Sequence, residues 1–129
     1  MIDSDKVQRI LKDHPTLGAY GFEDGKGRSH DKSNTIDGES LGYALEFLSI
    51  CGPIKSPDKC SYHVKHLAEA WLRRSENPCH CYIGSGVMIV AAIYLGFPVK
   101  RQFGKNAYIG VSAKCEKWKK LPPLAKTWL

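Results

Sequence analysis

The strongest constraint on the fold is a run of nine residues, Val87 to Leu95, that contains no charged side chain. Ser85 and Gly86 precede the run and Gly96 follows it, a residue type that commonly closes a helix because it tolerates the left-handed conformation. A helix that is apolar around its whole circumference has no face to offer to water, so it is buried on all sides. The run reaches only about half of the ~18 residues needed to cross a bilayer. We therefore expect residues 85–96 to form the central helix of the fold.

Three further segments have apolar residues at helical spacing, which predicts amphipathic helices packed around the central one. They cover residues 4–13, residues 40–50, and a segment that starts at Ser61 and is closed by Asn77-Pro78. Ser4 is the expected cap of the first helix. The apolar stripes are Val7, Ile10 and Leu11 in the first segment, Leu41, Ala44, Leu45 and Leu48 in the second, and Val64, Leu67, Ala68, Trp71 and Leu72 in the third. The charged residues that fall outside the third stripe are Lys65, Glu69, Arg73 and Arg74.

The region after the central helix predicts a β-hairpin, because residues 99–103 alternate between apolar and polar, residues 104–106 suit a turn, and residues 107–111 return as a strand. The expected fold is therefore α+β and mainly helical, with about four helices around the buried helix 85–96 and a C-terminal hairpin at 99–111. At 129 residues, the chain is expected to form a single domain, 1–129. Five glycines, which match no phosphate-binding fingerprint, predict a flexible loop at about 15–38. Residues 113–129, interrupted by two prolines, are expected to form a basic C-terminal arm.

Charge is distributed unevenly along the chain. Residues 1–98 carry a net charge of −1, whereas residues 99–129 hold eight of the 19 lysines and arginines and a single acid, Glu116. Because cations neutralise phosphates and aromatic rings stack on bases, this end of the chain predicts contact with a nucleic acid or an acidic protein surface. The alternative is that the aromatic rings pack in the core and the lysines are merely solvated. The candidate contact residues are Lys100, Arg101, Lys105, Lys114, Lys117, Lys119 and Lys120, which lie among Phe103, Tyr108 and Trp118.

The five cysteines do not suggest a disulfide framework, because their number is odd and the N-terminal residues do not resemble a secretory signal. Reduced thiols and a cytoplasmic location are expected. The candidate zinc ligands are Cys60, His63, Cys79 and Cys81, but a C-x-C pair departs from the spacing typical of structural zinc, so we expect neither metal nor another cofactor. A thiolate near a histidine is the minimum for nucleophilic catalysis, and either His63 or His66 can approach the Cys79–Cys81 segment from the third helix.

Two sequence patterns carry a resemblance to a family. They are Ser61-Tyr62-x-x-Lys65-His66-x-Ala68-Glu69, and Tyr82-Ile83-x-x-Gly86-x-x-Ile89-x-Ala91-Ala92-x-x-x-Gly96-Phe97 followed by Asn106-Ala107-x-Ile109-x-x-Ser112. With them, residues 61–112 resemble an uncharacterised family of small proteins of bacteria and of their phages and plasmids, for which no activity is known. The resemblance implies that its shared polar positions, Ser61, Tyr62, Lys65, His66, Glu69 and Asn106, do more than fill a core. Lys65 and His66 are candidate catalytic residues, unless this group braces the helix against the hairpin.

These features favour a small binding protein, encoded by a mobile element, that contacts a nucleic acid or a nucleoprotein complex through its basic C-terminal region. An inhibitor of a host defence system is one example. The expected partner is a nucleic acid or an acidic protein surface rather than a membrane. Two alternatives remain open, namely a small enzyme that depends on a Cys/His or Lys/His pair, and a zinc-stabilised interaction domain. No motif specifies a reaction, so binding is the preferred interpretation.

Overall fold

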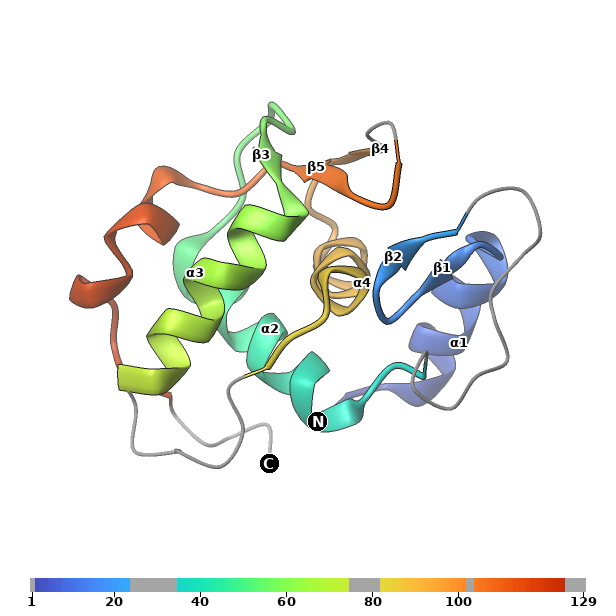
Figure 1. Cartoon of the computed structure of the whole chain (residues 1–129), viewed down its shortest axis with the longest axis horizontal. Coiled ribbons are helices and arrows are strands. Elements are labelled where there is room, and N and C mark those ends of the chain that lie inside the picture. Colours follow the sequence, from blue (N-terminus) through green and yellow to red (C-terminus); the bar gives the residue numbers. More distant parts are fainter. Residues whose placement is uncertain (1, 24–34, 75–81, 102–103, 125–129) are drawn as a thin grey trace.

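The computed structural model describes residues 2–23, 35–74, 82–101 and 104–124. The helices are α1 (Ser4–Asp13), α2 (Gly38–Cys51), α3 (Ser61–Arg74), α4 (Ser85–Leu95) and the 3₁₀ helix η2 (Ala113–Lys120). The strands are β1 (Leu17–Gly18), β2 (Gly21–Phe22), β3 (Lys59–Cys60), β4 (Val99–Arg101) and β5 (Ala107–Ile109). The mainly helical α+β class expected from the sequence is confirmed (Figure 1).

Helix α4 is the centre of the fold, as the sequence predicts. It contacts α1, α2, α3 and strands of both sheets. Figure 1 looks almost along its axis, with α2 and α3 on one side and α1 and the β1–β2 hairpin on the other. Side chains from Ser85 to Ala92 are buried, whereas those from Ile93 to Leu95 are half-buried. Gly96 ends the helix with a φ of 80°, in the left-handed region that glycine adopts without strain.

The predicted stripes of α1, α2 and α3 face the core, with Leu11 and Leu67 half-buried. The prediction that α2 is amphipathic is wrong, because its residues from Ser40 to Leu48 are all buried. Trp71 of α3 is fully buried, and its ring lies 5.5 Å from that of Phe47 in α2. Asp3, not Ser4, caps α1, because its carboxylate accepts hydrogen bonds from the backbone N–H groups of Asp5 and Lys6. Asp37 caps α2 in the same way, so this helix begins at Gly38, two residues before the predicted start.

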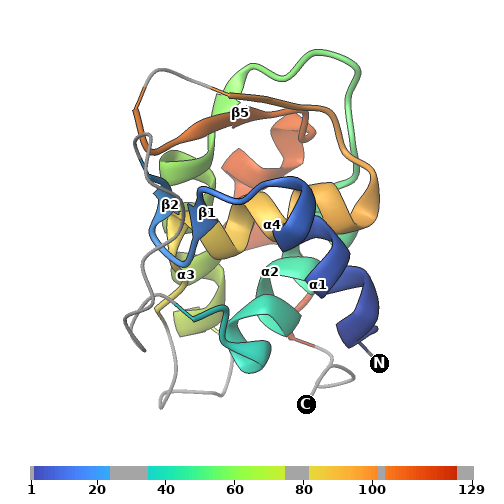
Figure 2. The same cartoon turned by 90° about the vertical axis from the view of Figure 1, so that its right-hand side faces the viewer.

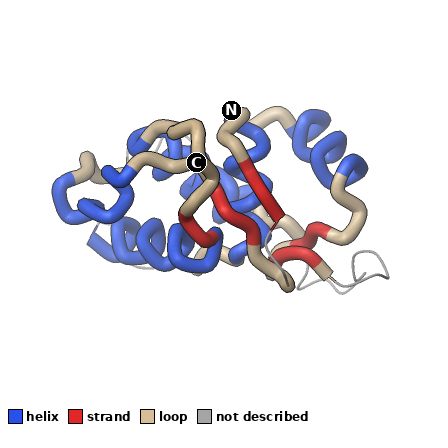
Figure 3. The backbone as a smooth tube through the Cα atoms, turned by 90° about the horizontal axis from the view of Figure 1, so that it is seen from above, coloured by secondary structure: helices blue, strands red, loops and turns tan. Residues whose placement is uncertain are grey.

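The C-terminal hairpin is confirmed and belongs to a larger sheet than the sequence predicts. Strands β3, β5 and β4 form an antiparallel sheet in that order, with Ile109 of β5 between Lys59 and Val99. Viewed from above, the strands occupy the middle of the molecule and helices lie at both ends (Figure 3). The sheet thereby joins the start of α3 to the segment that follows α4.

The prediction of a loop over residues 15–38 is wrong for residues 17–22. Strands β1 and β2 form a short antiparallel hairpin that lies against α4 (Figure 2). The backbone N–H of Gly86 in α4 donates to the carbonyl of Ala19 in the turn, and a Cβ at position 86 would stand 1.6 Å from the Gly18 carbonyl oxygen. Leu17 and Phe22 are buried in the core by this close approach. Residues 24–34 of the expected loop lie outside the described residues.

The expected C-terminal arm is packed onto the domain over residues 113–124. Helix η2 contacts α3 and α2, and three side chains of this segment enter the core: Cys115, Leu121 and Leu124. The indole N–H of Trp71 donates to the carbonyl oxygen of Pro122 at 2.6 Å. Apolar residues spaced a few positions apart are enough to anchor this segment to the core. The many lysines between them made the segment look like a solvated arm in the sequence. Residues 125–129 lie outside the described part of the chain.

Candidate functional site

The polar residues of α3 form a buried ion pair rather than a solvated face. Lys65 and Glu69, predicted to fall outside the core stripe, each expose only 7% of their side chain. The Lys65 Nζ lies 3.3 Å from Glu69 Oε2, which also accepts the backbone N–H of Ile83 at 2.8 Å. Glu69 Oε1 lies 3.2 Å from the Nδ1 of His66. Glu69 therefore holds together α3 and the segment that leads into α4.

Two tyrosines cover this ion pair from outside. The Lys65 ammonium lies 4.5 Å from the ring centroid of Tyr82 and 5.6 Å from that of Tyr62, distances at which a ring face attracts a cation. The Tyr62 ring also meets the His66 ring edge-on at 4.5 Å. Both tyrosines are about half exposed. Burial, followed by the nearby charge of Tyr20 and Glu69, raises the pKa of the Tyr82 hydroxyl.

The remaining polar positions of the family resemblance form a second network at the start of α3. The Ser61 hydroxyl accepts the backbone N–H of Ala107 at 3.1 Å and lies 3.0 Å from the Ser85 hydroxyl. Ser85 donates in turn to the side-chain carbonyl of Asn106 at 2.8 Å. This network joins α3, α4 and the β4–β5 hairpin. Four of the six resemblance positions therefore tie different elements together, namely Ser61, Lys65, Glu69 and Asn106, whereas the contacts given for Tyr62 and His66 lie within α3.

The described residues of this cluster supply a base but no nucleophile. The imidazole of His66 is half exposed and oriented by Glu69, an arrangement that suits a general base. A covalent mechanism also needs a nucleophile within hydrogen-bonding reach of that base. No serine, threonine or cysteine of the described residues makes a hydrogen bond with His66. The buried Lys65 is engaged by Glu69 and two rings. These contacts make Lys65 part of a brace, and a catalytic role for Lys65 and His66 stays a prediction.

Two of the cysteines are unsuited to nucleophilic chemistry. Burial raises the pKa of the Cys51 thiol to about 12 and that of Cys115 to about 11. A thiolate, not a thiol, is the reactive species, so these two side chains stay unreactive at neutral pH. Cys79 and Cys81, the thiols considered in the sequence, lie outside the described residues.

The candidate zinc site is only partly visible. Cys60 is half-buried at the end of β3, and the Nε2 of His63 lies 2.8 Å from a carboxylate oxygen of Glu116 in η2. Within residues 2–23, 35–74, 82–101 and 104–124, no three His, Cys, Asp or Glu side chains are grouped as a metal site would require. The other two candidate ligands fall in the 75–81 gap, so the expectation that no zinc is bound stays untested, and so does the zinc-stabilised alternative.

The basic C-terminal region divides into two separate parts. Lys100, Arg101 and Lys105 belong to the β4–β5 hairpin, whereas the other four candidate lysines belong to η2. In Figure 1, η2 lies at the left edge and β4 at the upper right, with α3 and β3 between them. The seven residues singled out by sequence therefore do not line one continuous surface.

Helix η2 carries the denser group of cations. Its four exposed lysines are Lys114, Lys117, Lys119 and Lys120. Glu116 is the single acid of the helix and already pairs with His63. Trp118 is half-buried, and the Lys119 ammonium lies 5.6 Å from its ring. These residues give η2 an exposed face that is strongly positive and contains one large aromatic ring.

A groove runs between η2 and the C-terminal half of α3. It has a volume of about 500 Å³ and is lined by Ala70, Arg73, Arg74, Trp118 and Lys119. The Arg74 guanidinium donates to the backbone carbonyls of Lys119 and Leu121, so it fixes the end of η2. Arg73 is exposed and adds a cation from a second element. Sequence reasoning missed Arg73 because it lies 44 positions before Lys117.

Comparisons of the chain with protein families, with curated proteins and with solved structures found no match. The resemblance of residues 61–112 to an uncharacterised family therefore stays a prediction. Among the described residues, the structure contains no helix with the length and apolar character of a membrane span.

Proposed function

We propose that the protein binds single-stranded nucleic acid through the η2 face, defined as Arg73, Lys114, Lys117, Trp118, Lys119 and Lys120. The observation that carries the proposal is the groove between α3 and η2, in which a half-buried indole is surrounded by cations. Lysine and arginine attract the phosphate chain, and an aromatic ring stacks on any base. Stacking on Trp118 requires an unpaired base, which favours a single strand over a duplex.

The positive charge of the η2 face is available to a polyanion, because the protein's own described carboxylates do not neutralise it. In the described segment 104–124, Glu116 is the only acid, and His63 engages it. The four lysines of η2 and Arg73 make no ion pair with a carboxylate of the described residues. A small protein that covers nucleic acid in this way needs no active site. Such occlusion fits an inhibitor, encoded by a mobile element, of a host nucleoprotein complex.

Fluorescence anisotropy with a labelled single-stranded oligonucleotide, at about 50 and 200 mM salt, tests the proposal. We expect affinity to fall steeply between the two salt concentrations, because each neutralised phosphate releases counterions. The triple variant Lys117→Glu, Lys119→Glu, Lys120→Glu should lose binding. Trp118→Ala should weaken binding by about 1–3 kcal/mol while leaving the salt dependence unchanged, since it removes stacking and no charge.

A matched control separates the η2 face from a general effect of net charge. The variant Arg9→Glu, Lys12→Glu, Lys100→Glu changes the net charge by the same amount, at exposed residues of α1 and β4. It should keep most of the affinity of the parent. Equal losses in both triple variants would contradict the assignment to η2. No binding by the parent at the lower salt concentration would refute nucleic-acid binding and leave an acidic protein surface as the ligand of this face.

A further inference from the structure

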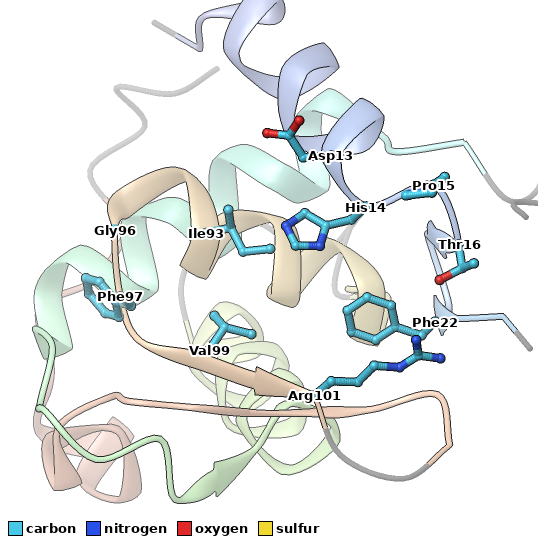
Figure 4. A pocket seen from close by; sticks show the side chains of 10 residues that line it. All are labelled: Asp13, His14, Pro15, Thr16, Phe22, Ile93, Gly96, Phe97, Val99 and Arg101. Atoms are coloured by element: carbon cyan, nitrogen blue, oxygen red, sulfur yellow. The ribbon is translucent and has the colours of Figure 1, made fainter.

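A second cavity lies at the opposite end of the molecule, between the end of α1, strand β2, the end of α4 and strand β4. Its volume is about 590 Å³, within the range of pockets that hold small molecules. Figure 4 shows the side chains that line it. Most of the wall is apolar, and three side chains can carry charge: Asp13, His14 and Arg101.

Arg101 is held at the edge of this pocket by an aromatic ring. Its guanidinium carbon lies 4.6 Å from the ring centroid of Phe22, and the Phe22 ring also meets the His14 ring edge-on at 6.4 Å. A guanidinium stacked on a ring keeps the N–H groups around its edge available for hydrogen bonds. Arg101 forms no ion pair with any described carboxylate. A planar set of donors is thus fixed beside an apolar wall.

The apolar wall comes from Ile93, Phe97 and Val99, and Asp13 stands at the α1 side of the pocket, away from Arg101 (Figure 4). The opposite charges of Asp13 and Arg101 set the polarity of a ligand. Arg101 matches a carboxylate, which it can bind through two parallel hydrogen bonds. Asp13 repels a second negative charge at the other end. The complementary molecule carries one carboxylate and an apolar body.

We propose that this pocket binds a small aromatic monocarboxylate, with the carboxylate on Arg101 and the ring against Phe22, Ile93 and Val99. The assignment removes Arg101 from the group of cations that the sequence linked to a polyanion. Strand geometry supports the separation, because Arg101 and Val99 share one face of β4 and both line the pocket, whereas Lys100 between them points to the other face. The site does not depend on the nucleic-acid function of η2.

Binding of 2-naphthylacetate to the full chain tests the proposal by isothermal titration calorimetry. The neutral amide, 2-naphthylacetamide, is the isosteric control for the carboxylate. We expect the acid to bind at least about tenfold more tightly than the amide, since hydrogen bonds to a charged acceptor are stronger than those to a neutral one. Arg101→Gln should reduce the affinity for the acid to that for the amide. Lys100→Gln, with the same charge change on the other face of the strand, should leave it unchanged.

Methyl NMR of the same titrations locates the ligand. Shifts confined to the methyl groups of Thr16, Ile93 and Val99 are expected, and they remain measurable if one variant is destabilised. Equal affinity for acid and amide, equal losses in both variants, or shifts elsewhere would overturn the proposal. So would preferential binding of 2-naphthylmethylamine, which would assign the pocket to a cation held by Asp13. Absence of acid binding at about 10 mM would also overturn it, because that corresponds to less than about 3 kcal/mol of binding.

Discussion

The buried Lys65–Glu69 pair gives the sharpest test of whether the α3 cluster is a brace or a catalytic site. Glu69→Gln keeps an oxygen that can accept the backbone N–H of Ile83, but it removes the negative charge. Lys65 is then a cation with 7% of its side chain exposed and no carboxylate beside it. Removing one partner of a buried pair typically costs about 3–5 kcal/mol, and the tyrosine rings offset part of that cost. We expect a loss of about 3 kcal/mol.

Lys65→Met should cost less, about 1–2 kcal/mol. The methionine preserves the apolar stem, and Glu69 retains the Ile83 N–H and His66 as partners. The double variant Lys65→Met, Glu69→Gln contains no unpaired buried charge, so it should be more stable than Glu69→Gln alone. A coupling energy of about 1–3 kcal/mol is expected for two residues in direct contact.

Urea unfolding followed by tryptophan fluorescence, to which the buried Trp71 contributes, measures all four proteins of this cycle. His66→Ala, which alters the half-exposed member, should change stability by less than about 1 kcal/mol. If the losses of unfolding free energy in the two single variants add up in the double variant, the brace interpretation is wrong. Additivity would mean that neither single change leaves an unpaired buried charge. Losses below about 1 kcal/mol in both single variants would do so as well, and would return Lys65 and His66 to the catalytic alternative.

Two further predictions follow from buried side chains. Trp71→Ala should destabilise the fold by about 3–5 kcal/mol, the usual cost of truncating a buried aromatic residue, because it opens a cavity and removes the hydrogen bond to Pro122; urea unfolding measures this, and a loss below about 1 kcal/mol would contradict the packing of the C-terminal segment on α3. The pKa values of Cys51 and Cys115 are raised from 9.0 to about 12 and about 11, so their contribution to stability is complete below pH 9 and is lost as the pH rises to about 11 for Cys115 and about 12 for Cys51. The parent should therefore lose more unfolding free energy between pH 9 and pH 11 than the variant Cys51→Ala, Cys115→Ala, and parallel curves for the two proteins would show that the thiols do not contribute.

The helices were predictable from sequence because buried apolar residues recur along each of them every three or four positions. The all-apolar run of α4 left no alternative to a central position, and the stripe from Val64 to Leu72 fixed the inner face of α3. The short strands were not predictable in this way. Strands β1, β2 and β3 contain two residues each, too few for an alternating pattern. Distant backbone bonds fix such strands, for example that from the Phe22 N–H to the Lys105 carbonyl.

The candidate sites show a second reason why the sequence is insufficient. Periodicity gives the direction of a side chain on its helix, but it does not show what covers that side chain. Lys65 lies off the stripe of α3 and is nevertheless buried, because Tyr82 arrives from a segment 17 residues later. Tertiary contacts also regroup two arginines that the sequence placed elsewhere. Arg73 of α3 lies across the groove from the lysines of η2, and Arg101 lines a pocket with Phe22, away from those lysines.

The rigidity of η2 connects the packing of α3 to the proposed binding. A lysine-rich segment without tertiary contacts would lose backbone freedom on binding, at about 1–2 kcal/mol for each residue ordered. In this fold three side chains of α3 already hold the η2 segment in place before any ligand binds. His63 holds Glu116, Arg74 binds the carbonyls that follow Trp118, and Trp71 donates to Pro122. The lysines themselves stay exposed on this fixed support, so ligand binding orders side chains and not backbone. A loss of these ties should therefore weaken binding even where every cation of the η2 face is retained.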